Sequence, residues 1–170
     1  EEPNTGLFIL ITQRPDKLLS TIRSRCQIVP FTRLKDNDVN KIIKKSNVIN
    51  ETNNIPNERI QELIAFSEGS PGKYLSNLQY WLDISNNLDE KLDIKLTNKI
   101  EVLQIAKEIT DKLNLEQQLW FINFQQNRAW EKDNDSVIVR ILEKLRRQLT
   151  SHVQPRLAWE VTLLEINFNN

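Results

Sequence analysis

The tripeptide Ser24-Arg25-Cys26 contains the side chain that is best suited to chemistry on a charged substrate. The guanidinium of Arg25 is planar and stays charged, and it can donate hydrogen bonds to two oxygens of one phosphate. An arginine that one protein places beside a nucleotide held by another stabilises the charge that develops during phosphoryl transfer. The alternative is a surface arginine at a helix C-terminus, where a cation favours the helix dipole. Residue type alone favours this alternative.

Two other groups of residues could do chemistry. Cys26 could act as a nucleophile with His152 as its base, but nothing in their spacing supports such a pair. Because the chain has one cysteine and one histidine, the sequence excludes an internal disulfide and a cysteine–histidine metal cluster.

A cationic stripe lies further along the chain, where Arg140, Lys144 and Arg147 share one face of a predicted helix. A phosphate-contacting face is one interpretation. A solvated face is favoured, because Glu143 interrupts the stripe and the whole chain has no net charge.

The elements that would position Arg25 are two short strands and a helix between them. The continuous apolar run 7–11 is typical of a strand that is buried on both faces. Leu18, Leu19 and Ile22 follow at helical spacing, and residues 27–31 indicate a second strand. The sequence therefore predicts a strand–helix–strand segment here, with its polar residues at the joints.

After Phe31 the pattern is helical, and three short helices are expected over residues 34–88. In the phrase Gly69-Ser70-Pro71-Gly72, Gly69 suits a helix C-cap, Ser70 an N-cap and Pro71 the first helical position. The expected inward residues are Val39, Ile42, Ile43, Ile60, Leu63, Ile64, Tyr74, Leu75, Leu78, Trp81 and Leu82.

A polar linker over 86–93 should lead to longer amphipathic helices over 89–170. The last of these begins at Pro155 and should turn Leu157, Val161, Leu164 and Phe168 inward. The aromatic bulk of Trp120, Phe121, Phe124 and Trp159 exceeds what a small bundle obviously needs, so we expect an assembly surface. The four tryptophans are expected in a core or an interface rather than in a ligand cage.

The composition of the 170 residues limits the classes of function. Lysine plus arginine equals aspartate plus glutamate, so no overall basicity indicates nucleic-acid binding. No signal peptide and no apolar run of about twenty residues is present, so a cytoplasmic protein is expected. The chain has no methionine and no phosphate-binding loop, and we therefore expect a C-terminal piece of a longer protein.

The ordered residues Thr12, Pro15, Leu18-Leu19, Ile22-Arg23 and Ser24-Arg25-Cys26 resemble the AAA+ subunits of bacterial DNA polymerase III clamp loaders. This resemblance implies that Thr12 takes the sensor-1 position. It implies that Arg25 is an arginine finger directed at ATP on the neighbouring subunit. It also implies a remnant of an AAA+ α/β domain at 1–33, a three-helix lid at 34–88 and an all-α collar at 89–170, so the chain is mainly α.

The lid pattern of the same family is Gly-Ser-x-Arg-x-Ala-Leu, and Gly69, Ser70 and Leu75 fit it. Its sensor-2 arginine is replaced by Gly72, and Tyr74 takes the alanine position. Lys73 lies one residue away, which turns it about 100° around the helix. The Gly-Ser-Pro-Gly form is similar to the delta-prime branch, whose members do not hydrolyse ATP.

The resemblance implies a stator role within the clamp loader. The expected partners are the gamma/tau and delta subunits, with the sliding clamp and primer-template DNA reached through the assembly. This piece is expected to hold no cofactor, because ATP would be bound by the neighbouring subunit. Two alternatives stay open: a gamma/tau ATPase subunit, against which Gly72 counts, and a helical adaptor without AAA+ ancestry.

Overall fold

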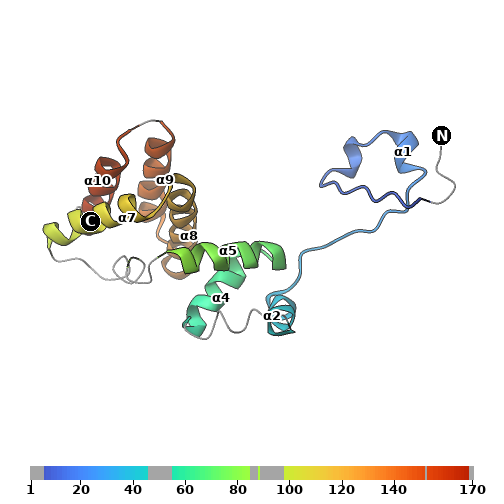
Figure 1. The fold of residues 1–170 in the computed structure, drawn as a ribbon, viewed down its shortest axis with the longest axis horizontal. Helices are drawn as coiled ribbons and strands as arrows, with labels where there is room; N and C mark the ends of the chain where they lie inside the picture. Colours follow the sequence, from blue (N-terminus) through green and yellow to red (C-terminus); the bar gives the residue numbers. More distant parts are fainter. Residues whose placement is uncertain (1–5, 46–54, 85–87, 89–97, 152, 169–170) are drawn as a thin grey trace. The chain divides into compact units, whose positions relative to one another are not determined.

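The computed structural model describes residues 6–45, 55–84, 88, 98–151 and 153–168. It divides the chain into two compact units, Glu1–Thr32 and Arg33–Asn170. Its described part is mainly helical and contains no β-strand (Figure 1). None of its helices is long and apolar enough to cross a membrane. The predicted linker over 86–93 lies outside the described residues except for Leu88, which is buried.

The described residues of the first unit form the 3-10 turn η1 (Pro15–Lys17) and the one-turn helix α1 (Ser20–Arg23). The two predicted strands are not formed, because neither 7–11 nor 27–31 has strand pairing. A strand requires a neighbour for its backbone N–H and C=O groups, and the described residues place none beside either run. The apolar side chains of both runs are exposed, so they form no core here.

The first part of the larger unit, which we call the lid segment (34–88), shows the three expected helices in its described residues 34–45, 55–84 and 88. They are α2 (Asp36–Lys45), α4 (Asn57–Phe66) and α5 (Pro71–Asp83). Their buried residues include Val39, Ile43, Leu63, Ile64, Tyr74, Leu78 and Trp81, whereas Ile42, Leu75 and Leu82 are exposed. Ser70 is the N-cap of α5, as expected, and its hydroxyl accepts a hydrogen bond from the N–H of Lys73 at 3.3 Å.

The turn between α4 and α5 depends on Gly69. The C-cap of α4 is Ser67, two residues before the predicted position, and both Glu68 (φ 51°) and Gly69 (φ 76°) adopt the left-handed conformation. The carbonyl of Gly69 accepts a hydrogen bond from the N–H of Leu34 at 3.1 Å. A Cβ on Gly69 would lie 2.2 Å from the Leu34 carbonyl oxygen, so only glycine allows this close approach.

The second part, which we call the collar segment (89–170), forms four longer helices where the structure describes it, over 98–151 and 153–168. They are α7 (Lys99–Lys112), α8 (Leu115–Asp133), α9 (Ser136–Thr150) and α10 (Pro155–Phe168). Helix α8 packs against α9, and α10 packs against both α7 and α9 (Figure 1). Asn114 begins α8 with a capping box, in which Asn114 and Gln117 bond each other's backbone N–H groups.

The inward face of α10 differs from the predicted one by about one residue. Leu157 and Val161 are 51% and 44% exposed, while Ala158, Trp159, Thr162 and Leu163 are buried. The indole N–H of Trp159 donates to the side-chain oxygen of Gln118 at 2.9 Å, so this large ring is fixed inside the bundle. The small Ala158 and Thr162 leave room for neighbouring helices. Leu164 packs against the core, as predicted, but the prediction was wrong for Leu157, Val161 and Phe168, which are exposed.

Candidate functional site

Arg25 lies in a tight turn directly after α1. The N–H of Arg25 donates to the carbonyl of Ile22 at 3.1 Å, and the Ser24 hydroxyl donates to the carbonyl of Thr21 at 3.2 Å. These bonds fix the backbone of the Ser-Arg-Cys tripeptide, while the side chains of Arg25 and Cys26 are exposed. The turn therefore presents a permanently charged side chain at the surface of its unit.

Thr12 precedes η1 in the same unit. Its hydroxyl oxygen accepts a hydrogen bond from the N–H of Arg14 at 3.0 Å, and Arg14 forms an ion pair with Asp16 at 3.4 Å. A threonine hydroxyl can donate one hydrogen bond while it accepts another. Thr12 and Arg25 thus belong to one compact unit, on either side of η1 and α1.

Gly72 belongs to the other unit, at the second residue of α5. A Cβ built on it would meet no atom within 4 Å, so a longer side chain would fit without a clash. The neighbouring Lys73 lies 3.4 Å from the carboxylate of Glu68, which also pairs with Arg33 at 3.2 Å. The start of α5 thus carries no arginine, although its geometry would admit one.

A cluster of aromatic rings joins the lid segment to the collar segment. Trp120 and Phe124 of α8 stack at 5.3 Å between ring centroids, and Tyr80 of α5 stacks on Trp120 at 5.6 Å. Phe66 of α4 meets Phe124 edge-on at 5.5 Å. The indole N–H of Trp120 donates to the side-chain oxygen of Asn77 at 2.9 Å. These rings are part of one continuous core that includes both segments.

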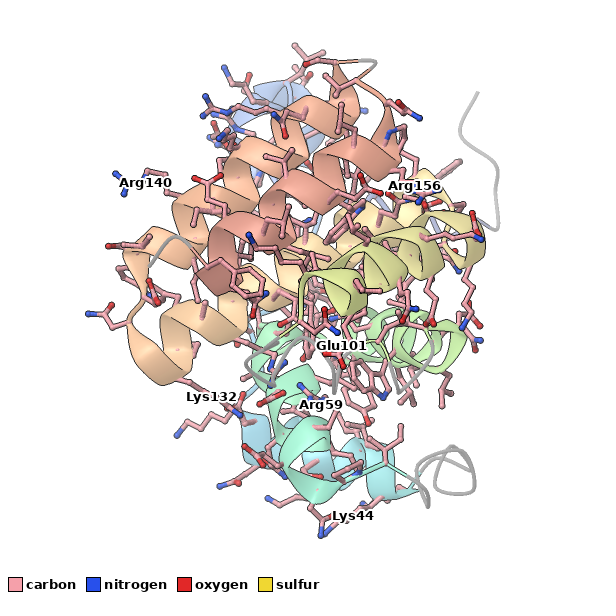
Figure 2. All side chains as sticks on the ribbon, turned by 90° about the vertical axis from the view of Figure 1, so that its left-hand side faces the viewer. Lys44, Arg59, Glu101, Lys132, Arg140 and Arg156 are labelled. Atoms are coloured by element: carbon pink, nitrogen blue, oxygen red, sulfur yellow. The ribbon has the colours of Figure 1, made fainter. Side chains whose placement is uncertain are left out.

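Ion pairs between α4 and α8 lie at the edge of this junction. Glu62 of α4 pairs with Arg128 of α8 at 3.2 Å, and the two side chains are only 14% and 9% exposed. Lys132 of α8 lies 2.7 Å from the carboxylates of both Glu58 and Glu62. Arg59 pairs with Glu62 and lies over the ring of Trp81 at 4.7 Å, and Figure 2 labels Arg59 and Lys132 at this junction.

The ion pairs at the junction shift the pKa values of their members. The hydrogen bond from Lys132 lowers the pKa of the Glu58 carboxyl below its usual value of 4.5. Hydrogen bonds to Glu58 and then to Glu62 raise the pKa of Lys132. Both shifts mean that the charged forms of Glu58 and Lys132 are favoured in the folded chain. The two residues therefore attract each other across the contact between the segments near neutral pH.

The sequence predicted part of this junction. Trp81, Trp120 and Trp159 are buried, as expected for core tryptophans, whereas Trp130 is 54% exposed. Because Trp120, Phe121, Phe124 and Trp159 are buried within the unit, they cannot form the expected assembly surface. The buried polar partners Asn77, Gln118 and Arg128 were missed. Asn77 and Trp81 lie four residues apart on one face of α5, and this spacing could have identified Asn77.

The described residues contain no cluster of histidine, cysteine, aspartate or glutamate that could hold a metal ion. His152, the base considered for Cys26, lies outside the described part of the chain. The described residues therefore do not test a Cys26–His152 pair, and the role of Arg25 in charge stabilisation stays a prediction.

Two family models together match most of the chain. Residues 37–166 match cyanobacterial DNA polymerase III delta prime, C-terminal domain. Residues 1–35 match DNA polymerase III, delta subunit. No solved structure matches the chain.

The curated relatives include replication factor C small subunits. The protein of Methanococcus vannielii is 27% identical over 143 residues, which cover 81% of this chain and 44% of the relative. That of Methanococcus maripaludis strain C7 is 31% identical over 109 residues, covering 63% of this chain and 34% of the relative. The chain thus spans less than half the length of these relatives. The match over 37–166 shows that the chain belongs to the clamp-loader family of DNA polymerase III delta prime, C-terminal domain.

Proposed function

We propose that this chain is part of a delta-prime-type stator subunit of the DNA polymerase III clamp loader, acting in DNA replication in the cytoplasm. The observation that carries the proposal is the delta-prime family match over residues 37–166. The match of residues 1–35 to a DNA polymerase III subunit family supports the same assignment for the other unit. In this proposal residues 1–33 are the end of an AAA+ α/β domain, which would supply neighbours for the runs 7–11 and 27–31.

The proposed chemistry is stabilisation of a phosphoryl-transfer transition state in trans. Arg25 extends from its turn toward the γ-phosphate of ATP that is bound by an adjacent gamma/tau subunit, and its guanidinium neutralises the developing charge. Thr12 occupies the sensor-1 position. This chain contributes no sensor-2 arginine, because Gly72 replaces it, and we therefore propose that it holds no nucleotide of its own.

The proposed partners are the gamma/tau and delta subunits, with the sliding clamp and primer-template DNA reached through the assembly. Exposed aliphatic side chains on the packed helices α7 and α10 support a collar interface. They are Ile100, Leu103, Leu157 and Val161. Apolar groups of this kind gain free energy when a second protein covers them.

Sedimentation velocity of this chain with gamma/tau from the same organism tests the proposed assembly. We expect a faster-sedimenting complex that Val161→Asp weakens, because aspartate cannot be buried against an apolar partner without a large desolvation cost. Thr150→Asp, at an exposed position of α9, is the matched control and should leave the complex intact. If wild type forms no complex, the stator assignment is wrong.

A further inference from the structure

A hollow of about 360 Å³ lies along the outer face of α9 and the chain that follows it. Its walls are formed largely by the aliphatic stems of long charged side chains together with Val153. The lining residues also include Arg140, Lys144, Arg147, Gln148 and Ser151. This volume is within the range of pockets that accept a small ligand or a few side chains of a peptide.

The charges that face the hollow are mainly positive. Arg140 makes no hydrogen bond or ion pair with any described residue, whereas Lys144 pairs with Glu165 of α10 at 3.2 Å. Glu143, the one carboxylate in the lining, binds Arg147 at 3.2 Å and also Arg146 at 2.8 Å. Since the carboxylates of Glu143 and Glu165 are already engaged by these pairs, a surplus of cationic hydrogen-bond donors remains for an anionic ligand.

The C-terminal end of α9 would repel an anion if its carbonyl groups were open, but the chain caps them. The hydroxyl of Ser151 donates to the carbonyl of Arg147 at 2.6 Å. The N–H groups of Ser151 and Val153 both donate to the carbonyl of Gln148, at 3.1 and 3.4 Å. These bonds reduce the partial negative charge of the carbonyl groups at the C-terminal end of α9, beside the hollow.

We propose that this hollow binds a short acidic segment of a partner protein that carries an apolar residue between its carboxylates. Arg140 and Arg147 would bind the carboxylates, and Val153 and the aliphatic stems would contact the apolar side chain. A nucleic-acid strand fits less well, because the lining has no aromatic ring for base stacking and the chain has no net charge. This site is separate from Arg25 and goes beyond the proposed stator function.

Fluorescence anisotropy at low and moderate salt tests the proposal on the complete chain. The probe is a labelled peptide of alternating aspartate and leucine, with an asparagine–leucine peptide and labelled oligothymidine as comparisons. The variants are Arg140→Glu and Arg140→Glu combined with Arg147→Glu. Arg156→Glu is the control, because Arg156 is another exposed cation, on α10, that Figure 2 shows on the side of the bundle opposite Arg140.

We expect the acidic peptide to bind wild type and the control equally, with an affinity that falls several-fold in Arg140→Glu and about tenfold in the double variant. The asparagine peptide should bind more weakly than the acidic one. Circular dichroism checks folding, and Arg140→Gln replaces any variant that does not fold. The proposal is overturned if the acidic peptide does not bind, if Arg156→Glu weakens it as much as Arg140→Glu, or if oligothymidine binds this hollow more tightly.

Discussion

The two units of the chain contain similar apolar side chains in opposite environments. In the first unit Phe8 and Phe31 are 76% and 94% exposed, whereas Phe121 and Phe124 of α8 are completely buried. The larger unit has several long helices that cover one another, whereas residues 6–32 of the first unit show one helical turn and a 3-10 turn. Apolar residues are therefore insufficient for a core, because a segment of this size cannot enclose them without additional chain.

The largest expected effect on stability comes from replacing a buried phenylalanine with alanine, and the same replacement of an exposed phenylalanine in the first unit is its comparison. Phe124→Ala removes a ring that stacks on Trp120 and meets Phe66, and it should lower the free energy of unfolding by about 3–5 kcal/mol. Phe31→Ala should change it by less than about 0.5 kcal/mol, because its ring is exposed. Urea denaturation followed by circular dichroism measures both. Equal losses would mean that the two environments do not differ as described.

The two glycines of the lid segment provide a sharper test of where the larger unit begins. Gly69→Ala should cost about 1–3 kcal/mol, because its Cβ would strike the backbone of Leu34 at a positive φ. This loss should also release the chain at residues 33 and 34, which limited proteolysis would detect. Gly72→Ala is the matched control in open space, and it should be neutral or stabilise by up to about 1 kcal/mol. A destabilised Gly72→Ala would contradict this geometry.

The smallest expected effect concerns the junction between the lid and collar segments. Because the pKa of Glu58 is lowered in the folded state, its stabilising contribution is present above its usual value of 4.5 and disappears as the pH falls below it. Glu58→Gln should therefore be slightly less stable than wild type near neutral pH and equal to it in acid. Urea midpoints at a series of pH values measure the difference. A difference that grows in acid would exclude the Glu58–Lys132 pair as its cause.

The helices were largely predictable because their signals are local. The Ser70-Pro71 start of α5 and the apolar spacing of α9 identify elements without information about distant contacts. The strands at 7–11 and 27–31 were predicted from the same kind of pattern and are not formed. Strand formation depends on pairing with a neighbour, which no pattern within one segment supplies.

The sequence named candidate site residues, whose roles stay predictions, but it did not give the geometry around them. The motif identified Arg25, Thr12 and Gly72, and the structure adds the turn that exposes Arg25 and the open space at Gly72. The pairing of side chains across the junction between the lid and collar segments was not predictable, because partners such as Asn77 and Trp120 come from positions far apart in the sequence. The cationic hollow was not predictable either, since its shape depends on the chain after α9 as well as on the stripe itself.

The central claim is that Arg25 of the first unit acts on ATP held by a neighbour, and clamp- and DNA-stimulated ATP turnover by the reconstituted loader tests it most directly. We expect Arg25→Ala to leave folding almost unchanged, because its side chain is exposed. It should lower turnover only partially, because the rate of ATP hydrolysis falls roughly a thousandfold at one site while the other sites continue. Arg25→Lys should rescue poorly, since an ammonium cannot reproduce the guanidinium fork. Arg23→Ala, at the end of α1, is the matched control and should keep wild-type turnover. Unchanged turnover with Arg25→Ala would contradict the claim and leave Arg25 as a surface residue at a helix end.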